Sequence, residues 1–197
     1  LDHPPDLVVL DLMMPEMDGF ETLERMRADE RTQQIPVVIL SGRQLTQEDI
    51  KRLEKFTAVT LRSKDVFTQD EIAASVNQAL FGTDALPPHI SALAKQAVAY
   101  LHQNFDRPLS RQEIADELGM SEDYFSRTFH KELGISPWDY LNRYRVAQAK
   151  LLLTTTNDSV KRIGRKIGFT DPAYFSRAFA SRFGCPPSRY TRQGQTN

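Results

Sequence analysis

Three side chains within the first 64 residues have the chemistry needed to handle a phosphoryl group. Asp11, Ser41 and Lys64 each follow a short aliphatic run. Buried parallel strands read as aliphatic runs, so these residues would lie at the carboxyl edge of one sheet, where open α/β sheets place their sites. Asp11 would be the nucleophile, Lys64 a charge clamp and Ser41 a hydrogen-bond donor. An acidic residue at a strand end is also often only a cap or loop residue, so spacing alone leaves both interpretations open.

A second candidate site is repeated in the other half of the sequence. The segment 124–127, Tyr-Phe-Ser-Arg, recurs at 174–177, and its neighbours recur with it. Arginine can donate two hydrogen bonds to a guanine edge, and serine can bond several bases or a phosphate. The matched places of Arg127 and Arg177 therefore favour contact with DNA, against the alternative that both are ordinary exposed polar residues.

The repeat also indicates which elements carry these arginines. Each copy reads as a short helix, a turn that contains glycine, and a second amphipathic helix. Phe125 and Phe129 are spaced i, i+4, as are Phe175 and Phe179, so both pairs should face inward and hold the second helix against the first. This is the helix-turn-helix arrangement, whose second helix lies in a DNA major groove.

In this half of the chain every periodic stretch is typical of a helix. Ser110 with Glu113 has the spacing of a capping box, and Ser121 and Asp171 are typical of further helix caps. The predicted helices span residues 90–104, 110–118, 122–133, 137–154, 159–167 and 172–183, and glycines 119, 134, 168 and 184 stand where helices should stop.

The first half alternates short aliphatic runs with amphipathic stretches. Residues 7–10 and 37–40 read as strands buried on both faces, and 58–61 as a third, weaker strand. The helical stretches include 19–27 and 70–80. The order β-α-β-α-β-α predicts a parallel sheet with right-handed crossovers.

Composition limits the class of protein. The hydrophobic content of 40% and charged content of 26% are ordinary for a globular chain. Cys185 is the single cysteine, which excludes an internal disulfide, makes a structural zinc site unexpected and suits a reducing cytoplasm.

The net charge of −1 combines an acidic first half with a basic second half, which favours nucleic-acid binding by the second half over chance partition of the charges. Without a membrane-length apolar run or a signal peptide, we expect a cytoplasmic protein with no membrane contact from this segment.

Residues 88–193 resemble the DNA-binding domain of the AraC/XylS family of transcription factors. The resemblance is most specific over 163–190, the second copy of the repeat. It implies two subdomains joined by a long helix over 137–153, with recognition helices about 34 Å apart in successive major grooves. By the same resemblance, base contacts would come from Asp123, Ser126, Arg127 and His130 in the first copy and from Pro172, Ala173, Ser176 and Arg177 in the second.

Two departures from the family pattern affect the second copy. Gly164 stands where the family usually has alanine, which should loosen its helix by about 1 kcal/mol. Pro172 and Ala173 offer no side-chain hydrogen bond where the family often has polar residues, so base reading should be weaker there.

Four basic residues crowd the helix that precedes the second recognition helix. Contact with DNA phosphates, which fixes register without reading sequence, and a solvated basic face are the two interpretations. The four residues are Lys161, Arg162, Arg165 and Lys166.

Residues 5–81 resemble the later part of a response-regulator receiver domain. The match is carried by the pattern Asp-x-x-Met-Pro-x-x-Asp-Gly that begins at Asp11. The resemblance implies that Asp11 accepts phosphate from a histidine kinase or a phosphotransfer protein, and that Ser41 and Lys64 occupy the family's hydroxyl and lysine positions. It also implies that Asp11 and the backbone carbonyl of Met13 help to bind Mg²⁺ in an intact receiver.

The sequence departs from the receiver pattern in three ways. It begins at the third receiver strand, without the first two strands and the acidic pair that completes the metal site, so no metal is expected in this fragment. Asp65 stands where the family usually has proline, and Leu61 takes the place of the switch aromatic. A sheet without those strands should have an exposed edge and an uncovered face, which predicts instability or pairing with another chain, such as a second copy in a homodimer.

These features predict a multidomain chain with a flavodoxin-like α/β part and an all-α part. The later portion of a receiver would occupy 1–81, a linker with turn residues and a proline pair 82–88, and two helix-turn-helix motifs 89–193. The expected function is transcription regulation in a two-component system, in which a phosphorelay through Asp11 gates DNA binding. The alternative is the carboxy-terminal segment of a hybrid sensor histidine kinase that ends in this DNA-binding domain.

Two other classes of function use the same residues. A phosphatase of the haloacid-dehalogenase type would use Asp11 as its nucleophile, but it needs a second aspartate where Met13 stands, so no enzyme is expected. A dimerisation module without phosphate chemistry is the third reading, which an Asp11→Asn variant with normal regulation would favour.

Overall fold

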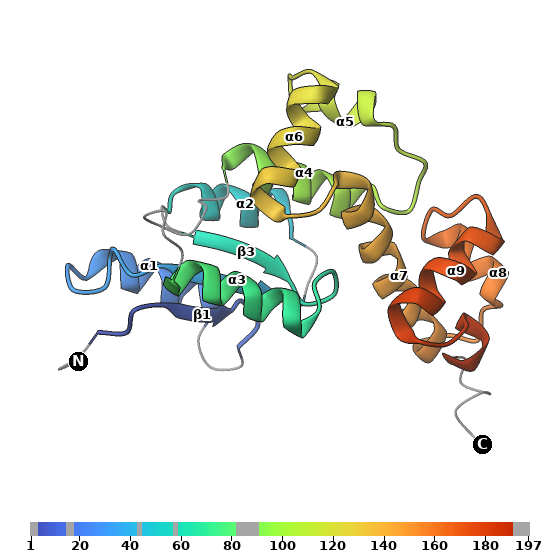
Figure 1. Ribbon diagram of the computed structural model, residues 1–197, viewed down its shortest axis with the longest axis horizontal. Helices are drawn as coiled ribbons and strands as arrows, with labels where there is room; N and C mark the ends of the chain where they lie inside the picture. Colours follow the sequence, from blue (N-terminus) through green and yellow to red (C-terminus); the bar gives the residue numbers. More distant parts are fainter. Residues whose placement is uncertain (1–3, 15–17, 43–44, 57–58, 82–90, 191–197) are drawn as a thin grey trace. The chain divides into compact units, whose positions relative to one another are not determined.

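The computed structural model describes residues 4–14, 18–42, 45–56, 59–81 and 91–190 (Figure 1). The chain divides into two compact units, the first Leu1–Ala99 with Lys131–Gly134 and the second Tyr100–His130 with Ile135–Asn197. The linker predicted at 82–88 lies outside the described residues. In the described ranges, no helix has both the length and the apolar character needed to cross a membrane.

The first unit contains a parallel sheet, as predicted. Its strands are β1 (Val8–Asp11), β2 (Val37–Ser41) and β3 (Val59–Ser63), in the order β1-β2-β3. Val37 of the middle strand pairs with Val8 on one side and Val59 on the other. The middle strand is almost wholly buried because its aliphatic run is covered on both faces.

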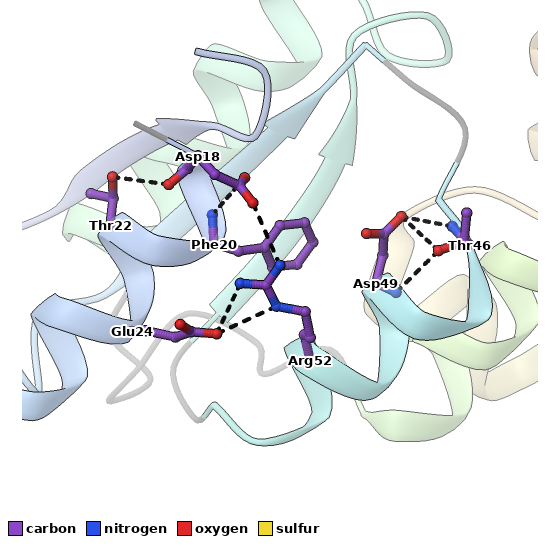
Figure 2. A network of polar contacts seen from close by, with 7 residues as sticks. All are labelled: Asp18, Phe20, Thr22, Glu24, Thr46, Asp49 and Arg52. Atoms are coloured by element: carbon purple, nitrogen blue, oxygen red, sulfur yellow. Dashed lines mark hydrogen bonds and ion pairs between the residues drawn. The ribbon is translucent and has the colours of Figure 1, made fainter. Parts of the chain in front are cut away.

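Helices alternate with these strands, and polar side chains begin them. The Asp18 side chain accepts a hydrogen bond from the Phe20 N–H at 3.2 Å. Thr46 and Asp49 form a reciprocal capping box, in which the Asp49 N–H donates to Thr46 Oγ1 and the Thr46 N–H donates to Asp49 Oδ2 (Figure 2). The helices are α1 (Gly19–Ala28), α2 (Gln47–Glu54) and α3 (Gln69–Phe81).

Arg52 joins α2 to the start of α1 (Figure 2). Its Nη2 lies 3.0 Å from Glu24 Oε1, and its Nη1 lies 3.4 Å from Asp18 Oδ2. Its Cζ also stands 4.3 Å from the centre of the Phe20 ring. Asp18 is the second aspartate of the Asp-x-x-Met-Pro-x-x-Asp-Gly pattern and caps α1, so Arg52 helps to hold the start of this helix in place.

The remainder of the described chain is helical. The bounds agree with the predicted ones within two residues, and glycines 119, 134, 168 and 184 all have positive φ, between 69° and 84°, as helix ends require. The elements are α4 (Ala92–Gln103), α5 (Arg111–Glu117), α6 (Glu122–Leu133), α7 (Pro137–Thr155), α8 (Val160–Lys166), α9 (Pro172–Phe183) and the 3-10 turn η1 (Pro187–Tyr190).

Paired phenylalanines hold each second helix on its partner, as predicted. Phe125 and Phe129 of α6 are fully buried, and their ring centres lie 5.8 Å apart. Phe175 and Phe179 of α9 repeat the arrangement at 6.0 Å. Both pairs meet edge to face, a favourable geometry for aromatic rings.

The long helix α7 packs against both motifs (Figure 1). Near its start, the Tyr140 ring lies 5.6 Å from that of Phe129 in the first motif. Further along, Val146 and Leu153 share a buried cluster with Phe175 of the second motif. One helix therefore supplies core to both halves of the repeat.

Candidate phosphoacceptor site and DNA-binding surface

Asp11 is the last residue of β1, and its carboxylate is held by two donors. Lys64 Nζ, just after β3, lies 2.5 Å from Asp11 Oδ2. The Met13 N–H donates to Asp11 Oδ1 at 2.9 Å. The Asp11 side chain is nevertheless 31% exposed, so the carboxylate can be reached from solvent.

Ser41 ends the middle strand of the same sheet. In the register of β2 and β3 it is opposite Ser63, and its backbone carbonyl accepts a hydrogen bond from the Lys64 N–H at 2.8 Å. Ser41 is buried, whereas Met13 is strongly exposed. The sheet therefore gathers Asp11, Ser41 and Lys64 at the carboxyl ends of its strands, and the roles assigned to them stay predictions.

The pKa of Asp11 lies below its ordinary value. Burial alone raises this pKa, but the hydrogen bonds from Lys64 and from the Met13 N–H, with the Lys64 charge, outweigh burial. Asp11 is therefore ionised at neutral pH, which is the form that a carboxylate nucleophile requires.

Gly19 has a steric role that the sequence pattern alone did not reveal. A Cβ at this position would lie 2.3 Å from the backbone oxygen of Asp11 and 2.7 Å from Cα of Leu12. The first turn of α1 thus packs directly on the backbone at the end of β1. The glycine of the Asp-Gly pair is what allows the helix to start beside the candidate phosphoacceptor.

The groups around Asp11 do not by themselves make a magnesium site. Within the described residues, no three His, Cys, Asp or Glu side chains gather closely enough to hold a metal ion. Mg²⁺ prefers near-octahedral oxygen coordination, and the contacts that the structure shows at the Asp11 carboxylate come from two donors, Lys64 Nζ and the Met13 N–H. The described residues that contact Asp11 therefore add no second carboxylate to a magnesium site.

The recognition helices α6 and α9 present equivalent faces. Ser126 and Ser176 are half-buried at matching places, and Arg127 and Arg177 are exposed beside them. Arg127 Nε donates to the backbone of its own helix at Asp123, at 3.2 Å. The other residues predicted to contact bases are exposed on the same two helices, namely Asp123, His130, Pro172 and Ala173.

Three polar residues at the motifs are helix caps, as predicted. Ser110 Oγ accepts from the Glu113 N–H at 3.0 Å, and Ser121 Oγ accepts from the Tyr124 N–H at 3.3 Å. Asp171 Oδ1 accepts a hydrogen bond from the first turn of α9 at 2.8 Å. Their side chains thus serve the ends of helices.

Asp158 forms ion pairs with two of the four basic residues of α8, and the sequence analysis did not predict this. Its carboxylate lies 3.2 Å from Arg162 and 2.7 Å from Lys166. The hydrogen bond from Lys166 is the largest cause that lowers the pKa of Asp158. Among the described residues, Lys161 and Arg165 form no ion pair. The i, i+4 spacing of Asp158 and Arg162 was the signal that could have revealed this pairing.

A hollow of about 240 Å³ between α8 and α9 brings predicted DNA contacts together. Lys161 and Arg165 line it from α8, and Pro172 and Ser176 line it from the first turns of α9. The hollow therefore places Lys161 and Arg165, which form no ion pair within the described part of the chain, beside the start of the second recognition helix.

Two family models match this chain. The model of the response regulator receiver domain matches residues 2–77, and that of the helix-turn-helix domain matches residues 114–193. Each match falls on the part of the chain where its elements are observed.

Curated relatives extend these matches. The HTH-type transcriptional activator RhaS of Escherichia fergusonii is 32% identical over 77% of this chain and 55% of its own length. The arabinose operon regulatory protein of Escherichia coli strain K12 is 32% identical over 54% of this chain and 37% of its own length. Histidine kinase P4 of Formosa agariphila is 25% identical over 94% of this chain but only 15% of its own length. The chain thus spans about half, or less, of the length of these relatives.

A solved structure gives the same assignment. The C-terminal domain of AraT, a response regulator from Geobacillus stearothermophilus, is 31% identical, with a TM-score of 0.50 over 53% of this chain and 87% of that one. The duplicated helix-turn-helix motif on a shared long helix and the parallel sheet that precedes it agree with these matches. Residues 114–193 therefore match the helix-turn-helix domain found in AraC-type regulators, and residues 2–77 match a response regulator receiver domain.

Proposed function

We propose that this chain is a sequence-specific DNA-binding regulator of bacterial transcription, controlled by a phosphorelay through Asp11. The observation that carries the proposal is the matched exposure of Arg127 and Arg177 on two helices whose opposite faces are buried by paired phenylalanines. We assign the receiver part to 1–81, the linker to 82–88 and the DNA-binding part to 89–193.

In this proposal the two motifs read DNA by different chemistry. Arg127 and Arg177 donate to guanine O6 and N7, the commonest specific arginine contact in the major groove. Beside Arg127, the first motif offers polar side chains. The second motif instead exposes Pro172 and Ala173 at the start of α9, and apolar groups of this kind suit the methyl group of thymine. We therefore expect the half-site of the second motif to favour thymine next to its guanine.

The basic residues of α8 position the protein on the DNA backbone. Lys161 and Arg165 are exposed, form no ion pair among the described residues and border the first turns of α9, so they suit phosphate contacts. Arg162 forms an ion pair with Asp158, so we expect it to contribute less to DNA binding. Contacts of this type strengthen binding to all sequences about equally and weaken with added salt.

Gel-shift titration tests the DNA-binding function. A preferred site is first selected from random DNA, and Arg127→Ala, Arg177→Ala and the double variant are then titrated on it. Each single change should weaken binding by about 1–3 kcal/mol and relax preference at one guanine. Arg25→Ala, an exposed arginine of the receiver part, is the matched control and should bind normally. A double variant that binds like the unchanged protein would remove the support for groove reading.

Asp11 is the proposed phosphoacceptor. One carboxylate oxygen forms a bond to phosphorus while the bond from phosphorus to the donor's leaving atom breaks, and that atom keeps the electron pair; it is an imidazole nitrogen in a phosphohistidine donor and an oxygen in acetyl phosphate. Lys64 stands where it can stabilise the charge on the transferred group. We propose that the phosphoryl donor, in the bacterial cytoplasm, is a histidine kinase or a phosphotransfer protein. We also propose that Mg²⁺ assists the transfer in an intact receiver domain. Phosphorylation then favours pairing with a second copy of the chain.

Labelling the full-length protein with radioactive acetyl phosphate and Mg²⁺ tests this step. We expect acid-stable, hydroxylamine-sensitive label that is absent from Asp11→Asn and present in Asp6→Asn, an exposed acidic control. Label that persists in Asp11→Asn, or an unchanged protein that takes up none, contradicts the proposal.

A second candidate function follows from one comparison. Histidine kinase P4 is similar to this chain over 94% of the chain's length, so we propose as the alternative that the two parts are the carboxy-terminal segment of a hybrid sensor histidine kinase. The gene sequence upstream of Leu1 decides between the two, since a kinase catalytic domain there would support the hybrid and a complete receiver start would support the separate regulator.

A further inference from the structure

A buried arginine in the middle of α7 forms no ion pair with any residue in the described part of the chain. Arg145 is 3% exposed. Its Nε donates to the backbone carbonyl of Phe105 and its Nη2 to that of Arg107, both at 2.7 Å. Phe105 and Arg107 lie between α4 and α5, in the segment that leads into the first helix-turn-helix motif. The guanidinium therefore ties α7 to the entry of that motif.

The same guanidinium lies against the turn of the second motif. Its Cζ is 5.7 Å from the centre of the Phe169 ring, which follows α8. Gly168, in that turn, has a φ of +84°, and a Cβ there would lie 2.7 Å from Arg145 Nη2 and 2.5 Å from the Phe105 backbone oxygen. There is no room for a side chain at this place. The turn of the second motif and the entry of the first thus meet at Arg145.

A neighbouring contact strengthens the joint. Asn142, one turn earlier on α7, donates from Nδ2 to the hydroxyl of Tyr174 at 3.0 Å, and Tyr174 belongs to α9. Burial lowers the pKa of Arg145 to about 10, so the guanidinium still carries its charge at neutral pH. Its two hydrogen bonds are therefore charge-assisted and hold a fixed planar geometry.

We propose that Arg145 is a positioning residue that fixes the second helix-turn-helix motif relative to the first, and so sets the spacing of the two DNA half-sites that the chain occupies together. The inference rests on the proposed DNA-binding function. Once the first motif is bound, a rigid connection holds the second motif at a high effective concentration near a half-site at one particular spacing. A loose connection distributes the second motif over many spacings, so its effective concentration at each spacing is lower. Half-site spacing is a geometric consequence of how two recognition helices are held.

The planar guanidinium group has several N–H donors in fixed directions, and this fork of donors distinguishes arginine from lysine at position 145. Arginine donates in two directions of one plane, to the carbonyls of Phe105 and Arg107, whereas lysine is a flexible point charge. Arg145→Lys therefore keeps the charge and most of the aliphatic stem but loses the fork. Arg145→Met removes both the charge and the hydrogen bonds.

Binding to a set of DNA duplexes tests the proposal. The set contains the selected full site, each half-site alone, and full sites whose halves are shifted together or apart by a few base pairs. We expect both Arg145 variants to bind the full site at least about tenfold more weakly, because the gain from linked binding is lost. Each half-site should bind as tightly as before, and the preference for one spacing should disappear.

Lys150→Met is the matched control. It removes a positive charge from the same helix, at an exposed residue whose ammonium lies over the rings of Phe183 and Tyr190, at 5.0 and 5.8 Å. It leaves the joint at Arg145 intact, so the spacing preference should survive in this variant.

Two results would overturn the proposal. One is an equal loss on full and half-sites, and the other is an unchanged spacing preference. Near-ultraviolet circular dichroism checks the fold of each variant, and if Arg145→Met does not fold, Arg145→Lys carries the test. Failure of the proposed function itself looks different, because the unchanged protein would then bind DNA without depending on Arg127 and Arg177.

Discussion

A single ion pair helps to lower the pKa of the candidate phosphoacceptor. Lys64 and Asp11 are both partly exposed, so solvent screens their attraction, and the pair contributes on the order of 1 kcal/mol or less to folding. Its larger effect is on protonation. Burial raises the pKa of Asp11, and the hydrogen bonds from Lys64 and the Met13 N–H more than reverse that rise.

Replacing Lys64 with methionine should therefore raise the pKa of Asp11. Because the folded-state pKa lies below the unfolded value of about 3.9, the stabilisation is present above that value and is lost as pH falls through the folded one. We expect Lys64→Met to lower the urea midpoint slightly at pH 7 and to leave it unchanged at pH values below both pKa values. An equal loss at both ends of the range would point to packing instead, and Asp11→Asn completes the double-mutant cycle.

Gly19 should tolerate no side chain. Gly19→Ala places a Cβ 2.3 Å from the Asp11 backbone oxygen, and the backbone must move to relieve this contact. We expect a loss of about 1–3 kcal/mol in the free energy of unfolding of the receiver part. Gly42→Ala is the matched control, because a Cβ there meets only Cδ of Lys64, at 3.8 Å. If both variants unfold at the same denaturant concentration, the close approach of α1 is not limiting.

The two helix-turn-helix motifs differ in how their first helix meets their second. Ala115 on α5 and Gly164 on α8 occupy matching buried places. A Cβ at Gly164 would stand 3.0 Å from Cδ1 of Phe175, which is 1% exposed and belongs to the buried cluster of the second motif. The expectation that Gly164 only loosens its helix leaves out this contact, since Phe175 occupies the space that a methyl group would need.

Reciprocal substitutions separate helix propensity from packing. Ala115→Gly should lower the free energy of unfolding by at least about 1 kcal/mol, because it weakens the helix and uncovers buried surface. Gly164→Ala should not recover the same amount, because the gain in propensity is offset by the contact with Phe175. Thermal unfolding of both variants checks this, and a full 1 kcal/mol of stabilisation by Gly164→Ala would show that Phe175 yields without cost.

A titratable side chain, His102, lies in the core of the second unit and makes the stability of that whole unit depend on pH. His102 of α4 is 1% exposed, lies 3.0 Å from the hydroxyl of Tyr140 through its Nε2, and stacks at 4.0 Å on Tyr144 of α7. Burial lowers the pKa of His102 to about 3. The unfolded chain takes up a proton at this residue over a pH range in which the folded chain does not.

The second unit should therefore lose stability in mild acid. A lowered folded-state pKa means that stability is full above the unfolded value of about 6.5 and falls as pH drops toward 3, by on the order of 1 kcal/mol per pH unit. Fluorescence of Trp138, the single tryptophan, follows urea unfolding of this unit. His102→Phe should flatten the dependence between pH 6.5 and 4, whereas exposed His130→Gln should not. An equally steep loss in His102→Phe would assign the effect to other groups.

The sequence by itself determined the elements and their repeat, because the signals for these are local. Paired phenylalanines at i, i+4, capping serines and glycines at helix ends depend on neighbours within one or two turns, so the predicted helices match the observed ones closely. The buried aliphatic runs indicated the parallel strands for the same reason. The candidate residues of both sites could be named at this level.

Only the tertiary structure decided how those residues are held. The distance from Lys64 to Asp11, the packing of Gly19 on the backbone of β1 and the hydrogen bonds from Arg145 to two carbonyls each join segments far apart in the chain. Every residue has a backbone carbonyl, so the type of the residue that accepts such a hydrogen bond does not reveal that the bond exists. Contacts of that kind follow from the folded path of the chain and cannot be read from residue types.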